Sequence, residues 1–297
     1  MDRRSFLGVA TAGAAVATTF CSTEDATWAH AVPAALNRVR LSITWGMFRD
    51  MPIPEALAHL ARLHYDGFEM FNWRKPEILE AIASEKKKYA LECATLVGNK
   101  GVTAPGCSLV NPKERDSFLQ EMNLAIDAAK KVDCKRLVTL TGNEVPGMSR
   151  AEMMDSCVAG LKAAAPMLEK NGITAVVEVL NTYVNHKGYF LYYVRDAAEM
   201  IDRVASPNVK ILFDIYHVQI MEGNLIQNIR SNFQRIGHFH IGDVPGRHQP
   251  GTGEINYRNV FKAIRDLGYE GFAALEYSPT ISLVENLAEM RKMTMFD

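Results

Sequence analysis

The sequence predicts a single (β/α)8 TIM barrel, an α/β fold in which parallel strands alternate with helices. Short apolar runs and longer stretches of helical spacing alternate from Arg40 onward, and this unit occurs eight times in about 265 residues. The expected strands are almost continuously apolar, as a parallel sheet covered on both faces requires. An open doubly wound sheet is the alternative, and the absence of G-x-G-x-x-G after the first run disfavours it.

The elements can be placed in chain order from apolar runs and helical periodicity. Pro54 favours a helix start, and Gly172 is a plausible helix C-cap. The expected strands are residues 41–45, 67–71, 91–97, 136–140, 173–179, 209–213, 236–241 and 272–275. The expected helices are residues 54–64, 76–89, 114–132, 150–171, 194–204, 225–233, 257–267 and 283–293.

The composition is that of an ordinary globular protein, with 48% hydrophobic residues and 33 basic against 34 acidic side chains. This balance gives no sign of a nucleic-acid or membrane-surface partner, because such proteins usually carry a basic excess. Beyond the N-terminus there are four cysteines, and none forms a C-x-x-C pair. We therefore expect Cys93, Cys107, Cys134 and Cys157 to be packed thiols rather than a metal or redox site.

Residues 1–31 have the pattern of an export leader. The motif Asp2-Arg3-Arg4-Ser5-Phe6-Leu7 resembles a twin-arginine signal, and an apolar run of small residues follows from Gly8 to Phe20. That run is shorter than the roughly 20 residues of a transmembrane helix. Ala29-His30-Ala31 fits a cleavage site. We expect residues 32–297 to form the mature barrel, exported to the periplasm without membrane insertion.

Polar residues stand at the ends of the fifth to eighth predicted strands: Glu178, Asp214, His240 and Glu276. Barrel enzymes build their sites at these carboxyl ends, so the four side chains should face one point. Three carboxylates in one pocket would repel each other without a cation. Oxygen ligands with one imidazole suit Mn²⁺, Mg²⁺ or Co²⁺, with Zn²⁺ as a further option. The pattern predicts one divalent metal ion.

The seventh strand opens into a loop, residues 242–253, which holds four glycines and two prolines. Its polar residues Asp243, Arg247, His248 and Gln249 could reach a small anionic or polyhydroxyl ligand. A strand that ends in histidine and continues into such a loop is typical of one wall of a barrel site.

Further polar residues are expected to bind substrate on the same rim. His217 follows Asp214 by three positions, Asn181 and His186 lie in the loop after Glu178, and Arg247 completes the set. The first four strands end in Trp45, Phe71, Asn99 and Asn143, a less charged half that could form an apolar wall.

With these residues the chain resembles the xylose isomerase-like barrels, specifically the hydroxypyruvate isomerase branch, from about Arg40 to Met293. The resemblance implies that Glu178, Asp214, His240 and Glu276 bind the metal. It also implies that Glu178 and Glu276 exchange protons with substrate carbon through an enediolate, while His217 and Arg247 hold substrate oxygens. The segments that carry it are VEVLNT (177–182), FDIYH (213–217), IGHFHIGDVPGRHQPGTGEIN (236–256) and ALEY (274–277).

The chain departs from that branch at His240, where hydroxypyruvate isomerases typically carry Gln and ketose 3-epimerases of the superfamily carry His. The function expected is a metal-dependent isomerase or epimerase of a small hydroxy-carbonyl compound or sugar, with homo-oligomerisation left open. One alternative is an exported lyase or hydrolase of 3-keto sugars. A nuclease of the endonuclease IV type is disfavoured by Asn99 and Asn143, and a non-catalytic sugar-binding barrel should tolerate loss of Glu276.

Overall fold

The computed structural model describes residues 38–49, 51–100 and 106–296, so the predicted leader lies outside the described residues. In this part of the chain, parallel strands form one sheet in the order β1-β8-β7-β6-β5-β4-β3-β2. A parallel bridge between Thr44 and Glu69 joins its two outer strands, β1 and β2. The strands are β1 (Arg40–Ile43), β2 (Gly67–Met70), β3 (Glu92–Val97), β4 (Arg136–Thr139), β5 (Thr174–Glu178), β6 (Val209–Asp214), β7 (Ile236–Ile241) and β8 (Phe272–Leu275). The predicted (β/α)8 barrel is confirmed.

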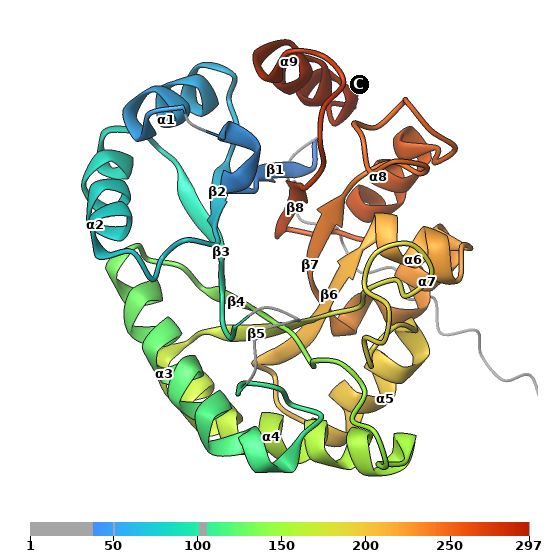
Figure 1. Cartoon of the computed structure of the whole chain (residues 1–297). Helices are drawn as coiled ribbons and strands as arrows, with labels where there is room; N and C mark the ends of the chain where they lie inside the picture. The colour runs from blue at the N-terminus through green and yellow to red at the C-terminus, as the bar shows by residue number, and fades with distance from the viewer. Residues whose placement is uncertain (1–37, 50, 101–105, 297) are drawn as a thin grey trace, which may run out of the picture. The chain divides into compact units, whose positions relative to one another are not determined.

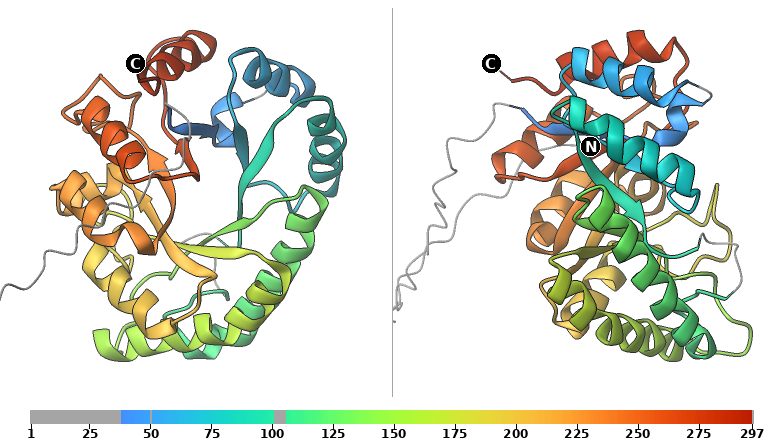
Figure 2. Two further views of the ribbon diagram at one scale, coloured as in Figure 1. Left: turned by 180° about the vertical axis from the view of Figure 1, so that it is seen from behind. Right: turned by 90° about the vertical axis from the view of Figure 1, so that its left-hand side faces the viewer.

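Helices surround the ring of strands, as Figures 1 and 2 show from three directions. Several of them bury one apolar stripe against the rest of the barrel. In the fifth helix, for example, Val194, Ala197, Ile201 and Val204 are buried at the spacing of one helical face. The helices are α1 (Ile53–Arg62), α2 (Pro76–Glu85), α3 (Arg115–Lys131), α4 (Arg150–Asn171), α5 (Val194–Val204), α6 (Ile215–Met221), α7 (Leu225–Asn232), α8 (Tyr257–Asp266) and α9 (Leu283–Met293).

Local sequence signals account for several helix ends. Ser149 and Glu152 form a reciprocal capping box at the start of α4, and Gly172 ends that helix with a left-handed φ of 60°. Gly172 thus has the predicted C-cap role. The described residues also contain four short 3-10 helices, at Trp45–Phe48, Lys86–Lys88, Pro112–Glu114 and Phe233–Arg235.

The sixth unit differs from the prediction, because a short helix, α6, follows β6 without any loop. Asp214, the last residue of the strand, is also the N-cap of this helix, and its Oδ1 accepts a hydrogen bond from the His217 amide at 3.1 Å. The apolar run continues from the strand into the helix, so the sequence pattern does not indicate where the strand ends and the helix begins. This turn places His217 next to Asp214.

The barrel interior contains a polar cluster as well as apolar side chains. Glu69 of β2 contacts His238 and His240 of β7, although these strands are not neighbours in the sheet. The three side chains must therefore meet across the inside of the barrel.

The four cysteines in the described residues are buried and unpaired, as predicted: Cys93, Cys107, Cys134 and Cys157. Among the same residues, no helix has the length and apolar character needed to cross a membrane.

Candidate active site

The four predicted metal ligands come together at the carboxyl end of the barrel. Glu178 and Asp214 end β5 and β6, His240 is the next-to-last residue of β7, and Glu276 directly follows β8. Each offers one ligand atom, and these atoms all lie within 4.8 Å of one another. Parallel pairing sets this arrangement, because the register places Asp214 beside His240 and the Glu276 amide on the Ile241 carbonyl.

His240 lies at the centre of the group and is 1% exposed. Its Nδ1 is 2.8 Å from Glu276 Oε2, 3.2 Å from Glu178 Oε1 and 3.8 Å from Asp214 Oδ2. The ring nitrogen nevertheless makes no hydrogen bond of acceptable geometry. Burial opposes a charge on the ring, but Glu276 and Glu69 outweigh it and raise the pKa of His240 well above its ordinary value. The nitrogen thus points between several oxygens rather than at one.

The two glutamates of the site have different proton affinities. Burial raises the pKa of Glu178 to about 7, even though His240 favours its ionised form. Burial also acts on Glu276, but Arg247 and His240 outweigh it and lower its pKa to about 2. A site in which the pKa values of two carboxyl groups are shifted in opposite directions can hold an acid and a base side by side.

Arg247 supplies positive charge to the same group of carboxylates. Its Nη2 donates hydrogen bonds to Asp214 Oδ2 at 2.7 Å and to Glu276 Oε2 at 2.6 Å. Its Nε donates to the Glu276 carbonyl at 2.9 Å, and Nη1 lies 3.0 Å from His217 Nε2. The guanidinium therefore balances two of the three carboxylates in this structure.

The other predicted substrate-binding residues divide into two groups. His186 and His217 line a cavity of about 350 Å³ beside the two glutamates. Asn181 is fully buried next to His217. Its backbone amide donates to His217 Nδ1 at 3.1 Å, and its side-chain amide donates to Asn185 Oδ1. Asn181 thus supports the position of a cavity residue and is not part of the cavity wall.

The predicted apolar wall is present, but only partly from the expected residues. Phe71 lines the cavity as expected. Asn99 is buried and holds two carbonyl groups, those of Cys107 and Leu140, with its amide. The remaining apolar lining consists of Val97, Val138, Leu140 and Leu180.

The loop after β7 is wound around a buried carboxylate. Asp243 accepts hydrogen bonds from the amides of Val244, Gly251, Gly253 and Ile255 at 2.9–3.2 Å. His248 and Gln249 contact the segment after β8, at the Ser278 carbonyl and Thr280. These side chains shape the loop that presents Arg247.

Sequence reasoning missed Glu69, which contacts His240 from the far side of the barrel. It lies inside the short buried strand Gly67–Met70 and is 0% exposed. A glutamate within a fully buried strand is itself unusual, and that was the available signal.

A second cavity of about 680 Å³ adjoins the first. The two share Phe71, Arg247 and Glu276, and the larger one extends over the segments after β1 and β8. The site thus opens into more space than a three-carbon molecule requires.

Comparison with known proteins agrees with this architecture. The family model described as "Xylose isomerase-like TIM barrel" matches residues 57–293. The chain therefore belongs to the xylose isomerase-like TIM barrel family. It is 34% identical over 203 residues to the hydroxypyruvate isomerase of Escherichia coli K12, covering 68% of this chain and 78% of that one. A 2-oxo-tetronate isomerase of Pectobacterium atrosepticum is 29% identical, covering 78% of this chain and 89% of that one.

A solved structure with the same fold is described as an AP endonuclease, family 2, from Brucella melitensis. It superposes with a TM-score of 0.78 at 29% sequence identity, covering 86% of this chain and 98% of that one.

Proposed function

We propose that this isomerase interconverts forms of a small hydroxy-carbonyl compound or sugar, with one divalent metal ion at Glu178, Asp214, His240 and Glu276. The observation that carries the proposal is the meeting of these four side chains within 4.8 Å at the ends of neighbouring strands. The isomerase relatives support the class of reaction.

The donor set fits a divalent ion. Three carboxylates and an imidazole nitrogen converge, and that nitrogen has no hydrogen-bond partner although it is buried. A buried polar atom without a partner is costly unless a ligand satisfies it. A mostly oxygen set favours Mn²⁺, Mg²⁺ or Co²⁺. When bound, the ion would polarise the carbonyl and hydroxyl groups of the substrate.

The 350 Å³ cavity beside these ligands suits a compact substrate. Its apolar wall would exclude water, while His186, His217 and Arg247 offer groups that can hydrogen-bond to substrate oxygens. Such contacts would orient the reacting C–H bond toward the glutamates.

Glu178 and Glu276 would carry the proton between neighbouring carbons. One carboxylate takes the proton from the hydroxyl-bearing carbon next to the carbonyl, which leaves an enediolate, and the same or the opposite glutamate returns it to the former carbonyl carbon, while the hydroxyl proton passes to the oxygen of that carbon. Both side chains line the same cavity, so either can reach a substrate held there.

The test is replacement of either glutamate by Gln, which keeps an oxygen donor but cannot take a proton near neutral pH. With Mn²⁺ occupancy measured directly, we expect metal-loaded Glu178→Gln and Glu276→Gln to lose about 10²–10⁴-fold in turnover of hydroxypyruvate or a ketose. Glu270→Gln, an exposed carboxylate just before β8, is the matched control. Near-normal rates in the metal-loaded site variants would contradict the proposal.

The larger neighbouring cavity favours a second candidate, a lyase or hydrolase acting on 3-keto sugars or their glycosides. A substrate of two sugar units would extend from the glutamates into the 680 Å³ space that borders Glu276 and Arg247. A substrate screen with Mn²⁺, Mg²⁺ and Co²⁺, followed by NMR in D₂O, separates the two. Release of a free sugar from a 3-keto glycoside, without isomerisation of the small substrates, would favour this candidate.

A nuclease is not supported by the described residues. The two groups of candidate ligands among them both contain His240, and Asn99, two residues after β3, uses its amide to donate to two carbonyl groups. A multinuclear cluster would need further ligands on the earlier strands.

A further inference from the structure

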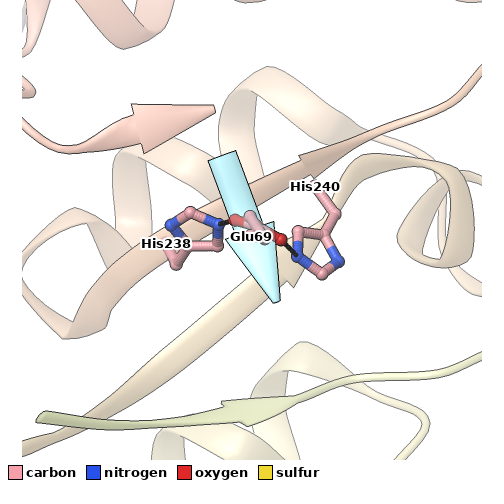
Figure 3. Close-up of side chains that lie close together, drawn as sticks. All are labelled: Glu69, His238 and His240. Carbon is pink, nitrogen blue, oxygen red and sulfur yellow. Dashed lines mark hydrogen bonds and ion pairs between the residues drawn. The ribbon is translucent and has the colours of Figure 1, made fainter. Parts of the chain in front are cut away.

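A buried carboxylate contacts the ring nitrogen of His240 that points away from the proposed metal. Glu69 Oε2 lies 3.1 Å from His240 Nε2, and Glu69 Oε1 lies 2.6 Å from His238 Nε2. All three side chains are at most 1% exposed. Figure 3 shows the carboxylate of Glu69 between the two imidazole rings.

The chemistry of this contact determines where the ring protons lie. An ionised carboxylate has no hydrogen to donate, so each ring must donate to Glu69 from Nε2. A ring that ligates a metal through Nδ1 is neutral, so its one proton then lies on Nε2 and its Nδ1 is free of a proton. In both His238 and His240, Nδ1 is buried and makes no hydrogen bond. The two rings thus have the same arrangement, but only His240 Nδ1 faces other ligand atoms.

We propose that Glu69 is a positioning residue that holds His240 in its ligating form. By accepting the Nε2 proton, it leaves the Nδ1 lone pair directed at the space between Glu178, Asp214 and Glu276, and it makes the ring a better electron donor. His238 donates to the other oxygen of the same carboxylate and so fixes its orientation. The inference rests on the metal-dependent function proposed above.

Without Glu69, the geometry of the site favours the wrong proton position. A buried Nε2–H with no acceptor carries a penalty, whereas a proton on Nδ1 would lie close to two carboxylates, because that nitrogen is 2.8 Å from Glu276 Oε2 and 3.2 Å from Glu178 Oε1 and would be attracted by their charge. That proton would occupy the position of the metal and would have to leave before an ion could bind.

The principal variant is Glu69→Met, which has a similar length and no strong acceptor. We expect its dissociation constant for Mn²⁺, measured by EPR of the free ion, to rise about 10–100-fold. In the Zn²⁺-loaded protein, a diamagnetic form suited to NMR, the His240 Nε2–H should give a strongly downfield, exchange-protected ¹H–¹⁵N signal. In Glu69→Met this signal should move upfield and lose its protection, because its acceptor is absent.

Two further variants make the test specific. Thr95 on β3 is the register partner of Glu69, is fully buried and has a hydroxyl without a hydrogen-bond partner, so Thr95→Val is a matched control that should change neither readout. Glu69→Gln retains the shape but has one amide oxygen for two donor rings. It should lie between the wild type and Glu69→Met in both measurements, and it serves alone if Glu69→Met does not fold.

The outcomes separate this inference from the proposed function. Wild-type protein that binds no Mn²⁺ would overturn the proposed function and this inference with it. Wild-type binding together with unchanged affinity and an unchanged His240 signal in the Glu69 variants would overturn the inference alone. Binding of two ions to the wild type, with one lost in Glu69→Met, would instead make Glu69 a direct ligand and also overturn it.

Discussion

At the residue scale, the main feature is that Arg247 and the proposed metal would bind the same carboxylates. The guanidinium donates to Asp214 and Glu276, two of the four predicted ligands. Its backbone has a positive φ of 54°, an uncommon conformation for a residue other than glycine. An ion and the guanidinium would both neutralise these carboxylates, so they should compete.

We therefore expect Arg247→Gln to bind Mn²⁺ several-fold more tightly than the wild type, because the ion no longer displaces a cation. The metal-free variant should lose on the order of 2 kcal/mol of unfolding free energy, between the values for exposed and fully buried ion pairs. Its KM should rise, since a predicted substrate contact is gone. Titration with Mn²⁺, urea unfolding and steady-state kinetics measure these effects.

Arg258→Gln, an exposed arginine on α8, is the control for loss of charge. Weaker Mn²⁺ binding in Arg247→Gln would show that Arg247 supports the ion instead of competing with it.

At the scale of elements, the loop after β7 depends on one buried acid. Four backbone amides donate to Asp243, and this wraps the glycine-rich segment around its carboxylate. The packing is tight at Gly253, where an added Cβ would overlap the Val244 carbonyl oxygen. The glycines and prolines that predicted a loop thus form an ordered structure that presents Arg247.

Replacing Asp243 by Asn should loosen this loop. The amide nitrogen of Asn is a donor, so it would face backbone N–H groups that need an acceptor. We expect a loss of about 2–4 kcal/mol in unfolding free energy, since hydrogen bonds to a charged group are among the stronger ones. KM should rise as Arg247 loses its position, with kcat changed less.

Urea unfolding and steady-state kinetics of Asp243→Asn test this, with Asp266→Asn at the exposed end of α8 as the control. Unchanged stability and unchanged KM would show that the loop does not need the carboxylate.

At the scale of the whole molecule, the barrel brings residues of four sequential strands to one end and connects them to β2 across the interior. In the described residues, the four cysteines are buried, unpaired thiols. None of them belongs to a group of candidate metal ligands there, so they do not compete with the proposed centre.

We also propose that the chain is exported through its predicted twin-arginine leader, residues 1–31. Changing Arg3 and Arg4 together to Lys should keep the protein in the cytoplasm, because the signal depends on the arginine pair. Fractionation of cells followed by immunoblotting measures this, with Arg38→Lys, outside the leader, as the control. Undiminished periplasmic delivery of the double variant would contradict the proposal.

The sequence by itself determined the barrel and most of the rim, because both depend on local signals. Apolar runs and helical spacing marked the strands and helices, and the polar residues at strand ends Glu178, Asp214, His240 and Glu276 could be found from their repeat. The helix α6 was missed since its apolar residues continue those of β6 without a break.

Only the tertiary structure decided which side chains support the site from elsewhere. Glu69 and His240 are 171 positions apart and meet because the barrel closes, which no local pattern encodes. The pairing of Arg247 with Asp214 and Glu276, and the burial of Asn181 behind His217, likewise depend on how loops fold over the strand ends. The sequence pattern predicts which strand a residue belongs to, whereas the closing of the barrel and the packing of the loops determine which side chains lie opposite it.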